Sequence, residues 1–332
     1  MKSRSRYLVI GNLSLGILLI ILFFIDLKLG SVNIAFDDIL NGLFNYDSTS
    51  TEELTVRIFR FPRVLTAVLA GSALAVSGLL MQTLFQNPLA GPYVLGINSG
   101  SGLMVALATM TGIGFLSSNL GLVASALLGA LLAGAIILIC SIYVKNRVSL
   151  LLVGIMFGSF TGALISVIQS YSNPDDLKVF MLWSFGSLQN VSPDQLGILS
   201  GVVIFGILLT VFLIKPLNIL ILGEVDARFL GVKVKATRVL IIFVTALLVG
   251  TTTAYCGPIA FAGLIVPNIV KLIYRTSDHF HLITGSILAG AVMILVCDMA
   301  MQIAQPYIHI PLNALTAIIG APVVVWIILK RF

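Results

Sequence analysis

The sequence predicts an all-α polytopic membrane protein with ten transmembrane helices and both termini in the cytoplasm. Of its 332 residues, 58% are hydrophobic and only 10% are charged, whereas a soluble domain carries roughly 25% charged residues. The mean hydropathy is +1.10, and residues 64–144 contain no Asp, Glu, Lys or Arg. Such a composition excludes an ordinary soluble enzyme, a disordered protein and a nucleic-acid binder, because so few charges could not cover a water-exposed surface.

Breaks in the apolar windows divide them into spans of about 20 residues, the length that crosses a bilayer. The Pro- and Gly-rich segments 87–92 and 112–119 divide the long uncharged window into three, and Gly257-Pro258 divides residues 239–270. The first span is not expected to be a cleaved signal, because residues 26–29 form a poor cleavage site. The ten predicted spans are 7–27, 64–84, 93–112, 120–143, 148–170, 195–214, 238–256, 259–274, 282–304 and 313–329.

The distribution of Lys and Arg predicts the orientation, because cytoplasmic loops of membrane proteins carry an excess of these residues. With the N-terminus inside, five of the 19 Lys and Arg residues fall outside and 14 inside. Removing one internal span would invert every loop beyond it, so the span count and the charge bias support each other. The five outer residues are Lys28, Arg57, Arg60, Arg63 and Lys178.

No motif for chemistry accompanies these spans. The chain has no P-loop, no His-Glu-x-x-His and no GxSxG, and Cys140, Cys256 and Cys297 lack the CxxC spacing of a metal or disulfide site. We therefore predict no catalytic residue, metal site or cofactor, which leaves a channel, a transporter or the membrane part of a larger machine. Asp298 is the one clear ionisable candidate within the spans; it could serve ion coupling, but a carboxylate hydrogen-bonded between helices near the outer interface is favoured. Without a buried relay, a partner ATPase is the favoured energy source, and an ion-coupled secondary transporter of a small solute is the alternative.

A stripe of glycines marks the fifth predicted span. Gly154, Gly158 and Gly162 recur every four residues and therefore share one face of a helix. Small residues let another backbone come close, so this face is expected either to pack against a neighbouring helix or to line a pathway for a bulky solute.

Three stretches carry a resemblance to a known family. They are Arg60-Phe61-Pro62-Arg63-Val64-Leu65 continuing to residue 100 through Asn87-Pro88-Leu89-Ala90-Gly91-Pro92, then Ala227-Arg228-Phe229-Leu230-Gly231-Val232, and Gly257-Pro258-Ile259-Ala260-Phe261-Ala262-Gly263-Leu264-Ile265-Val266-Pro267-Asn268. Together they resemble the FecCD family of ATP-binding cassette (ABC) importer permeases, which take up ferric siderophores, haem and cobalamin. The resemblance runs in order from about residue 55 to the end.

The resemblance implies a FecCD-type permease fold over a single domain, residues 1–332, in the cytoplasmic (inner or plasma) membrane of a bacterium. It implies a second copy of the chain, a cytoplasmic ABC ATPase dimer and an extracytoplasmic substrate-binding protein as partners, with no nucleic acid. The solute would pass along the homodimer interface, beside the fifth and tenth helices. A ferric siderophore is favoured over haem or cobalamin, and ATP hydrolysis would belong to the separate ATPase.

The segment 215–237 is expected to lie in the cytoplasm and to contain a short helix from about Glu224 to Leu230, ended by Gly231. A solvated loop would not explain why Phe229 and Leu230, two apolar side chains, are presented to water in this segment. The resemblance implies that it is the coupling helix, which sits in a cleft of the ATPase. The coupling residues would be Ala227, Arg228, Phe229, Leu230 and Gly231.

Arg60 and Arg63 lie at the outer end of the second span, against the positive-inside bias. They could anchor the helix end by reaching toward water. The resemblance implies instead that they receive carboxylates of the binding protein, which suits the planar fork of arginine. Gln302 stands where some relatives have another outer arginine. Tyr307 and His309 in the last outer loop could contact haem or a metal chelate, but a lone histidine is more often a plain surface group, and His309 is not predicted as a ligand.

Overall fold

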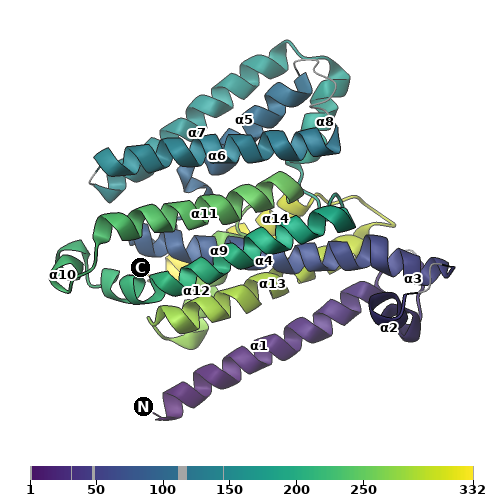
Figure 1. The fold of residues 1–332 in the computed structure, drawn as a ribbon, viewed down its shortest axis with the longest axis horizontal. Helices are drawn as coiled ribbons and strands as arrows, with labels where there is room; N and C mark the ends of the chain where they lie inside the picture. The colour runs from purple at the N-terminus through teal and green to yellow at the C-terminus, as the bar shows by residue number, and fades with distance from the viewer. Residues whose placement is uncertain (1, 31, 47–48, 111–117, 145, 332) are drawn as a thin grey trace.

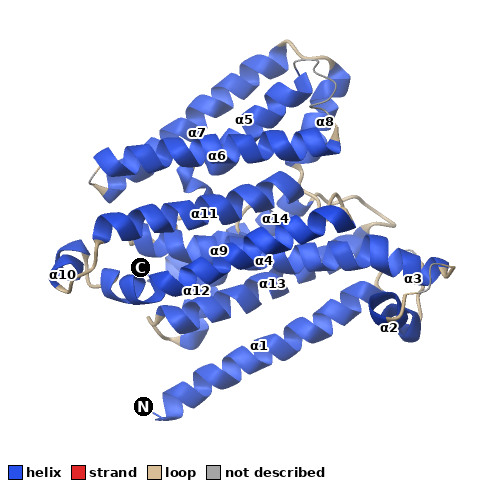
Figure 2. Cartoon of the chain, viewed as in Figure 1, coloured by secondary structure: helices blue, strands red, loops and turns tan. Residues whose placement is uncertain are grey.

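The computed structural model describes residues 2–30, 32–46, 49–110, 118–144 and 146–331, and these residues form helices and short connections without a β-strand (Figure 2). The helices are α1 (Lys2–Lys28), α2 (Phe36–Phe44), α3 (Thr51–Thr55), the π-helix η1 (Val56–Arg60), α4 (Phe61–Phe85), the 3₁₀-helix η2 (Pro92–Leu95), α5 (Ile97–Met110), α6 (Asn119–Tyr143), α7 (Arg147–Ser170), α8 (Pro174–Ser184), α9 (Pro193–Leu220), α10 (Glu224–Phe229), α11 (Val234–Cys256), α12 (Ala262–Tyr274), α13 (His279–Ala304) and α14 (Leu312–Arg331).

Seven helical segments of the described chain are long and apolar enough to cross a membrane: Tyr7–Lys28, Thr51–Phe85, Leu120–Tyr143, Arg147–Ser170, Pro193–Leu220, Val234–Cys256 and His279–Ala304. Three shorter apolar helices, Ile97–Met110, Ala262–Tyr274 and Leu312–Ile327, occupy the remaining predicted ranges. Each predicted span thus contains an apolar helix, while ten crossings and the placement of the termini stay predictions. Residues 112–117 of the predicted break lie outside the described residues.

The structure adds helix to segments that the sequence predicts as polar connections. Residues 28–62 contain α2 and α3, and α3 runs through η1 into α4 without a break. Pro62 does not interrupt this run; it is the second residue of α4 and directly follows the junction with the π-helix η1. Residues 171–194 contain α8, so the predicted outer loops are largely helical.

Helix α4 lies at the centre of the bundle, against α9, α11, α12 and α13 (Figure 1). In its most apolar stretch, 89% of the residues are buried. Its glycines permit direct backbone contact: a Cβ atom at Gly78 would overlap the carbonyl of Gly263 on α12, and one at Gly71 would overlap that of Gly290 on α13. Such close approach provides the dispersion contacts that hold helices together in lipid.

The two ends of the bundle carry different elements. Figure 1 shows both termini and α10 toward one end, and α2 and α3 at the opposite end. This arrangement agrees with the predicted orientation, in which the termini and the segment 215–237 share the cytoplasmic side. We refer to these as the inner and outer ends.

We expect Gly78→Ala to lower the thermal stability of the protein in detergent, because the new methyl group would meet backbone atoms that cannot rotate away. Overpacking of this kind costs about 1–3 kcal/mol or more. A thiol-reactive fluorophore can follow unfolding, since Cys256 and Cys297 are buried in the folded chain. Gly16→Ala on α1, where nothing lies within 4 Å, is the matched control. Equal unfolding temperatures for the two variants would contradict the proposed close packing.

Candidate functional site

Helix α10 is a short helix whose end is set by its own backbone. The amide of Val232 donates to Ala227 O at 2.9 Å and the amide of Gly231 to Arg228 O at 3.0 Å. Gly231 has a φ of +83°, a conformation that suits glycine. These two bonds form a Schellman motif. The expected short helix ended by Gly231 is therefore confirmed.

The side chains of α10 divide into a buried anchor and an exposed apolar surface. Ala227 is fully buried, whereas Phe229 is 86% exposed, and Val225 and Leu230 are also exposed. We call Val225, Phe229 and Leu230 the α10 patch. Three large apolar side chains are thus exposed within residues 225–230 at the inner end. Single exposed apolar residues are ordinary on a protein surface, but a group of this kind fits a binding surface.

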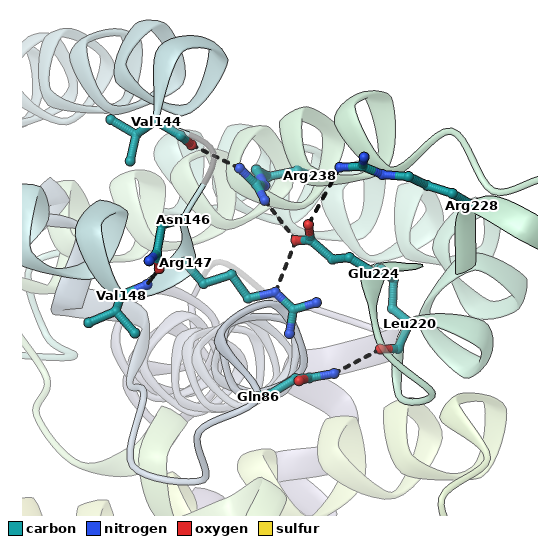
Figure 3. A network of polar contacts seen from close by, with 9 residues as sticks. All are labelled: Gln86, Val144, Asn146, Arg147, Val148, Leu220, Glu224, Arg228 and Arg238. Atoms are coloured by element: carbon teal, nitrogen blue, oxygen red, sulfur yellow. Dashed lines mark hydrogen bonds and ion pairs between the residues drawn. The ribbon is translucent and has the colours of Figure 1, made fainter. Parts of the chain in front are cut away.

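One carboxylate organises the base of α10. Glu224 Oε1 accepts hydrogen bonds from Arg147 Nε at 2.9 Å and from Arg238 Nη2 at 2.7 Å, while its Oε2 lies 3.8 Å from Arg228 Nη2 (Figure 3). Arg238 also donates to the carbonyl oxygen of Val144 at 3.0 Å. Residues from the starts of α7, α10 and α11 thus meet at this carboxylate, and Arg238 also connects it to the residue after α6. We call Glu224, Arg147, Arg228 and Arg238 the Glu224 cluster.

The surroundings of Glu224 keep its carboxylate ionised. Burial alone would raise its pKa, but the hydrogen bonds from Arg147 and Arg238, with their positive charges, lower the pKa below its ordinary value. The cluster therefore keeps its charge pairing at neutral pH. Sequence reasoning did not find this cluster, because Glu224 and Arg147 are 77 positions apart and no pattern along the chain connects them.

Arg60 is directed into the protein. Its guanidinium donates to the carbonyls of Leu27 and Lys28 at 2.9 and 3.0 Å, and also to the carbonyl of Val32. These acceptors belong to the end of α1 and the chain that follows, where helical carbonyls lack intrahelical donors. Arg60 is buried and fastens the outer end of α1 to the start of α4.

Arg63 is paired with Asp298 in a bidentate ion pair. Its Nε lies 2.8 Å from Asp298 Oδ2, and its Nη2 lies 2.8 Å from Oδ1. Gln302 donates from its side-chain amide to Asp298 at 3.1 Å and also to Asp26 of α1. Residues from α1, α4 and α13 are thereby joined at the outer end, and Asp298 is an interhelical partner rather than an isolated charge.

Docking of a binding protein at Arg60 and Arg63 stays a prediction. The structure gives both side chains internal partners, and Arg63 is the more accessible, with 15% of its side chain exposed. Arg63 also lines an outer cavity of about 480 Å³ together with Asp26 and Gln302. Arg57 is exposed, with its guanidinium 4.6 Å from the centre of the Tyr46 ring.

The glycine stripe of α7 has two kinds of environment. A Cβ atom at Gly154 would overlap Val94 O, so this end of the stripe packs closely on η2. At Gly162 nothing lies within 4 Å. Gly158 and Gly162 line a cavity of about 220 Å³ bordered by residues of α5 and α8, including Trp183. The stripe therefore packs closely at Gly154 and borders open space at Gly162, while its lining of a solute pathway stays a prediction.

Comparison with known proteins identifies related chains. A profile of the FecCD transport family matches residues 18–330. The hemin transport system permease protein HmuU of Yersinia pestis is 36% identical over 96% of both chains. The vitamin B12 import system permease protein BtuC of Salmonella paratyphi A is 36% identical over 99% of this chain and 98% of its own length.

A solved structure supports the same relationship. It is described as an inward-facing conformation of a metal-chelate type ABC transporter, and it matches 96% of this chain and 98% of its own. The TM-score is 0.85 and the sequence identity is 29%.

We expect Arg60→Met to lower the unfolding temperature in detergent, because buried carbonyls at the end of α1 would lose their donor. An unsatisfied buried polar group costs about 1–3 kcal/mol. The same thiol-reactive assay measures the effect. Arg57→Met, at an exposed arginine one turn earlier, serves as the control and should change little. If the two variants unfold at the same temperature, Arg60 does not fasten α1.

Proposed function

The chain belongs to the FecCD transport family of ABC importer permeases, and we propose that two copies of it form the path by which an iron chelate, haem or cobalamin crosses the bacterial cytoplasmic membrane. In this proposal residues 1–332 act as one permease domain with no chemistry of their own. A cytoplasmic ATPase dimer supplies the energy, and an extracytoplasmic binding protein delivers the solute.

The α10 patch is the observation that carries the proposal. Phe229, on a short helix at the inner end, is 86% exposed, so it packs little against the described part of the chain. Because Arg228, Lys233 and Lys235 are close to it in the sequence, the segment suits the cleft of a water-soluble protein better than the bilayer core. The five predicted coupling residues then have different roles; they are Ala227, Arg228, Phe229, Leu230 and Gly231. Ala227 anchors the helix, Gly231 ends it, and the other three contact the ATPase.

Helix α7 supports the placement of the solute path. Only 11% of the residues in its most apolar stretch are buried, so most of its surface is available for contact with lipid or with a second copy of the chain. Gly158 and Gly162 leave open the cavity beside α5 and α8, and a wall without side chains at these two positions would suit a bulky solute. We place α7 and α14, the fifth and tenth predicted spans, beside the path between the two copies.

The chemistry of the solute is proposed from the relatives. Those named above are described by their transport of hemin, vitamin B12 and a metal chelate, which are all large, metal-containing molecules. We favour an iron–siderophore complex, and identification of the solute bound by the co-purifying binding protein would test this choice directly.

Docking of the binding protein is proposed at the outer end, centred on Arg63. Its guanidinium is partly exposed beside the outer cavity, and Arg60 holds the neighbouring end of α1 in place. Carboxylates of the binding protein would therefore meet Arg63 at a rigid rim. Arginine pairs of this kind mainly speed association, and salt weakens the effect.

The alternative of an ion-coupled secondary transporter depended on Asp298. This carboxylate is held in a bidentate pair by Arg63, and the family is one of ABC permeases. A separate ATPase is therefore the energy source that we propose.

We expect Phe229→Asp to weaken association with the ATPase by about 30-fold, which corresponds to the roughly 2 kcal/mol typical of a buried aromatic anchor. The measurement is the affinity of the purified ATPase for the chain in lipid nanodiscs. Tyr307→Asp, at an exposed aromatic in the outer loop after α13, is the control and should bind normally. Normal binding by the Phe229 variant would show that the ATPase uses another surface.

We expect Gly162→Phe to abolish uptake without harming assembly, because the new ring would enter open space along the proposed path. Uptake of hemin, cyanocobalamin and a ferric siderophore into proteoliposomes would be measured in parallel. Gly201→Phe on α9, also at an exposed glycine with nothing within 4 Å, should retain uptake. Equal activity of both variants would place the path elsewhere.

A further inference from the structure

The Glu224 cluster joins two helices that are far apart in the chain. Glu224 is the first residue of α10, and Arg147 is the first residue of α7. Their side chains meet at 2.9 Å (Figure 3). Along the chain, α10 is connected only to its neighbours α9 and α11, so this ion pair is a direct link from α10 to α7.

We propose that Glu224 is a positioning residue that couples α10 to α7, so that displacement of α10 by the ATPase moves the inner end of the helix beside the solute path. This inference rests on the proposed function and adds a mechanical connection within it. The motion then reaches α7 through a side-chain contact, in addition to the chain connections through α9 and α11.

Burial makes the link stiff enough for this role. The exposed fractions of the Glu224, Arg147 and Arg238 side chains are 19%, 18% and 8%. Ion pairs largely removed from water are screened little by salt and hold a defined geometry. Arg228, in contrast, is 65% exposed and lies 3.8 Å away, so it adds charge without fixing the position of the carboxylate.

Arg238 determines where the carboxylate lies. It belongs to the second turn of α11 and donates both to Glu224 and to the carbonyl of Val144 after α6. Arg238 is thus fixed between the start of α11 and the end of α6, and it holds Glu224 Oε1 in place. The same oxygen also accepts a hydrogen bond from Arg147. A shift of α10 changes the distance to Arg147 unless α7 follows.

The inner end of α7 has its own local cap, and the pair with Glu224 is separate from it. The side chain of Asn146 accepts a hydrogen bond from the amide of Val148 at 2.8 Å. Helix α7 can therefore begin at Arg147 without the carboxylate. Loss of the ion pair should disconnect α7 from α10 without unwinding either helix.

The test compares three variants in the full chain, assembled with its ATPase and binding protein in nanodiscs. Ser149→Cys, at an exposed position in the first turn of α7 beside Arg147, provides a labelling site, and Cys140→Ser removes a partly exposed native thiol. The rate of labelling by a water-soluble maleimide is measured without nucleotide and with ATP plus vanadate. The variants are Glu224→Gln, Arg147→Gln and, as the control, Asp226→Asn, which removes an exposed charge from the same helix.

We expect nucleotide to change the labelling rate in the unsubstituted background and in Asp226→Asn. Glu224→Gln and Arg147→Gln should lower this response at least about fivefold, the lower range of measured allosteric couplings, while ATPase affinity stays normal. A merely structural role would lower stability in both variants and leave the response of the assembled complex intact.

The outcomes separate the two proposals. A normal labelling response in both Gln variants would overturn the coupling role of Glu224 while leaving the permease function in place. If Glu224→Gln fails to assemble, Arg147→Gln decides, because it keeps the bond between Glu224 and Arg238. Absence of ATPase binding in the unsubstituted background would overturn the proposed function itself.

Discussion

The direct backbone contact of α4 with α12 and α13 is the constraint on which the rest of the structure depends. Lipid offers no hydrophobic force to press helices together, so packing distance decides their association. Gly71 and Gly78 remove the side chains that would hold α4 apart from Gly290 and Gly263. With α4 fixed at the centre, α9 and α11 pack on its remaining surface, and the weakly buried helices α1 and α7 lie at the periphery.

Polar contacts at the two ends complete this core and differ in what they connect. At the outer end, Arg60 and the Arg63–Asp298 pair tie α1 and α13 to the start of α4. These contacts fasten the peripheral helix α1 and the packed helix α13 to the start of α4, and they hold the outer end in a defined geometry. At the inner end, the Glu224 cluster ties α10 to α7, which are both elements outside the core. A rigid outer rim and a linked, peripheral inner pair suit a protein that receives its solute at one end and its energy at the other.

A separate place for solute entry and for energy supply also agrees with the small number of ionisable residues along the spans. Apart from Asp26 and Asp298 near the outer end, the carboxylates of the described chain lie outside the ten predicted spans. A permease driven by a separate ATPase needs no proton or sodium relay at mid-membrane. It needs instead a surface for the ATPase and a path whose walls can move, which the α10 patch and α7 provide in the function that we propose.

The sequence alone determined the apolar helices, the short α10 and the family, because these depend on local composition and on residues that are close in the chain. Gly231 ends α10 through bonds only a few residues long, so its role was visible in the sequence. Tertiary structure decided the rest. Gly154 and Gly162 belong to one periodic stripe, yet one meets a backbone carbonyl and the other meets open space. Arg63 and Asp298 are 235 positions apart, and Glu224 and Arg147 are 77 apart. Hydropathy reports how each residue interacts with lipid or water, but the partner of a charge depends on which helices the fold brings together.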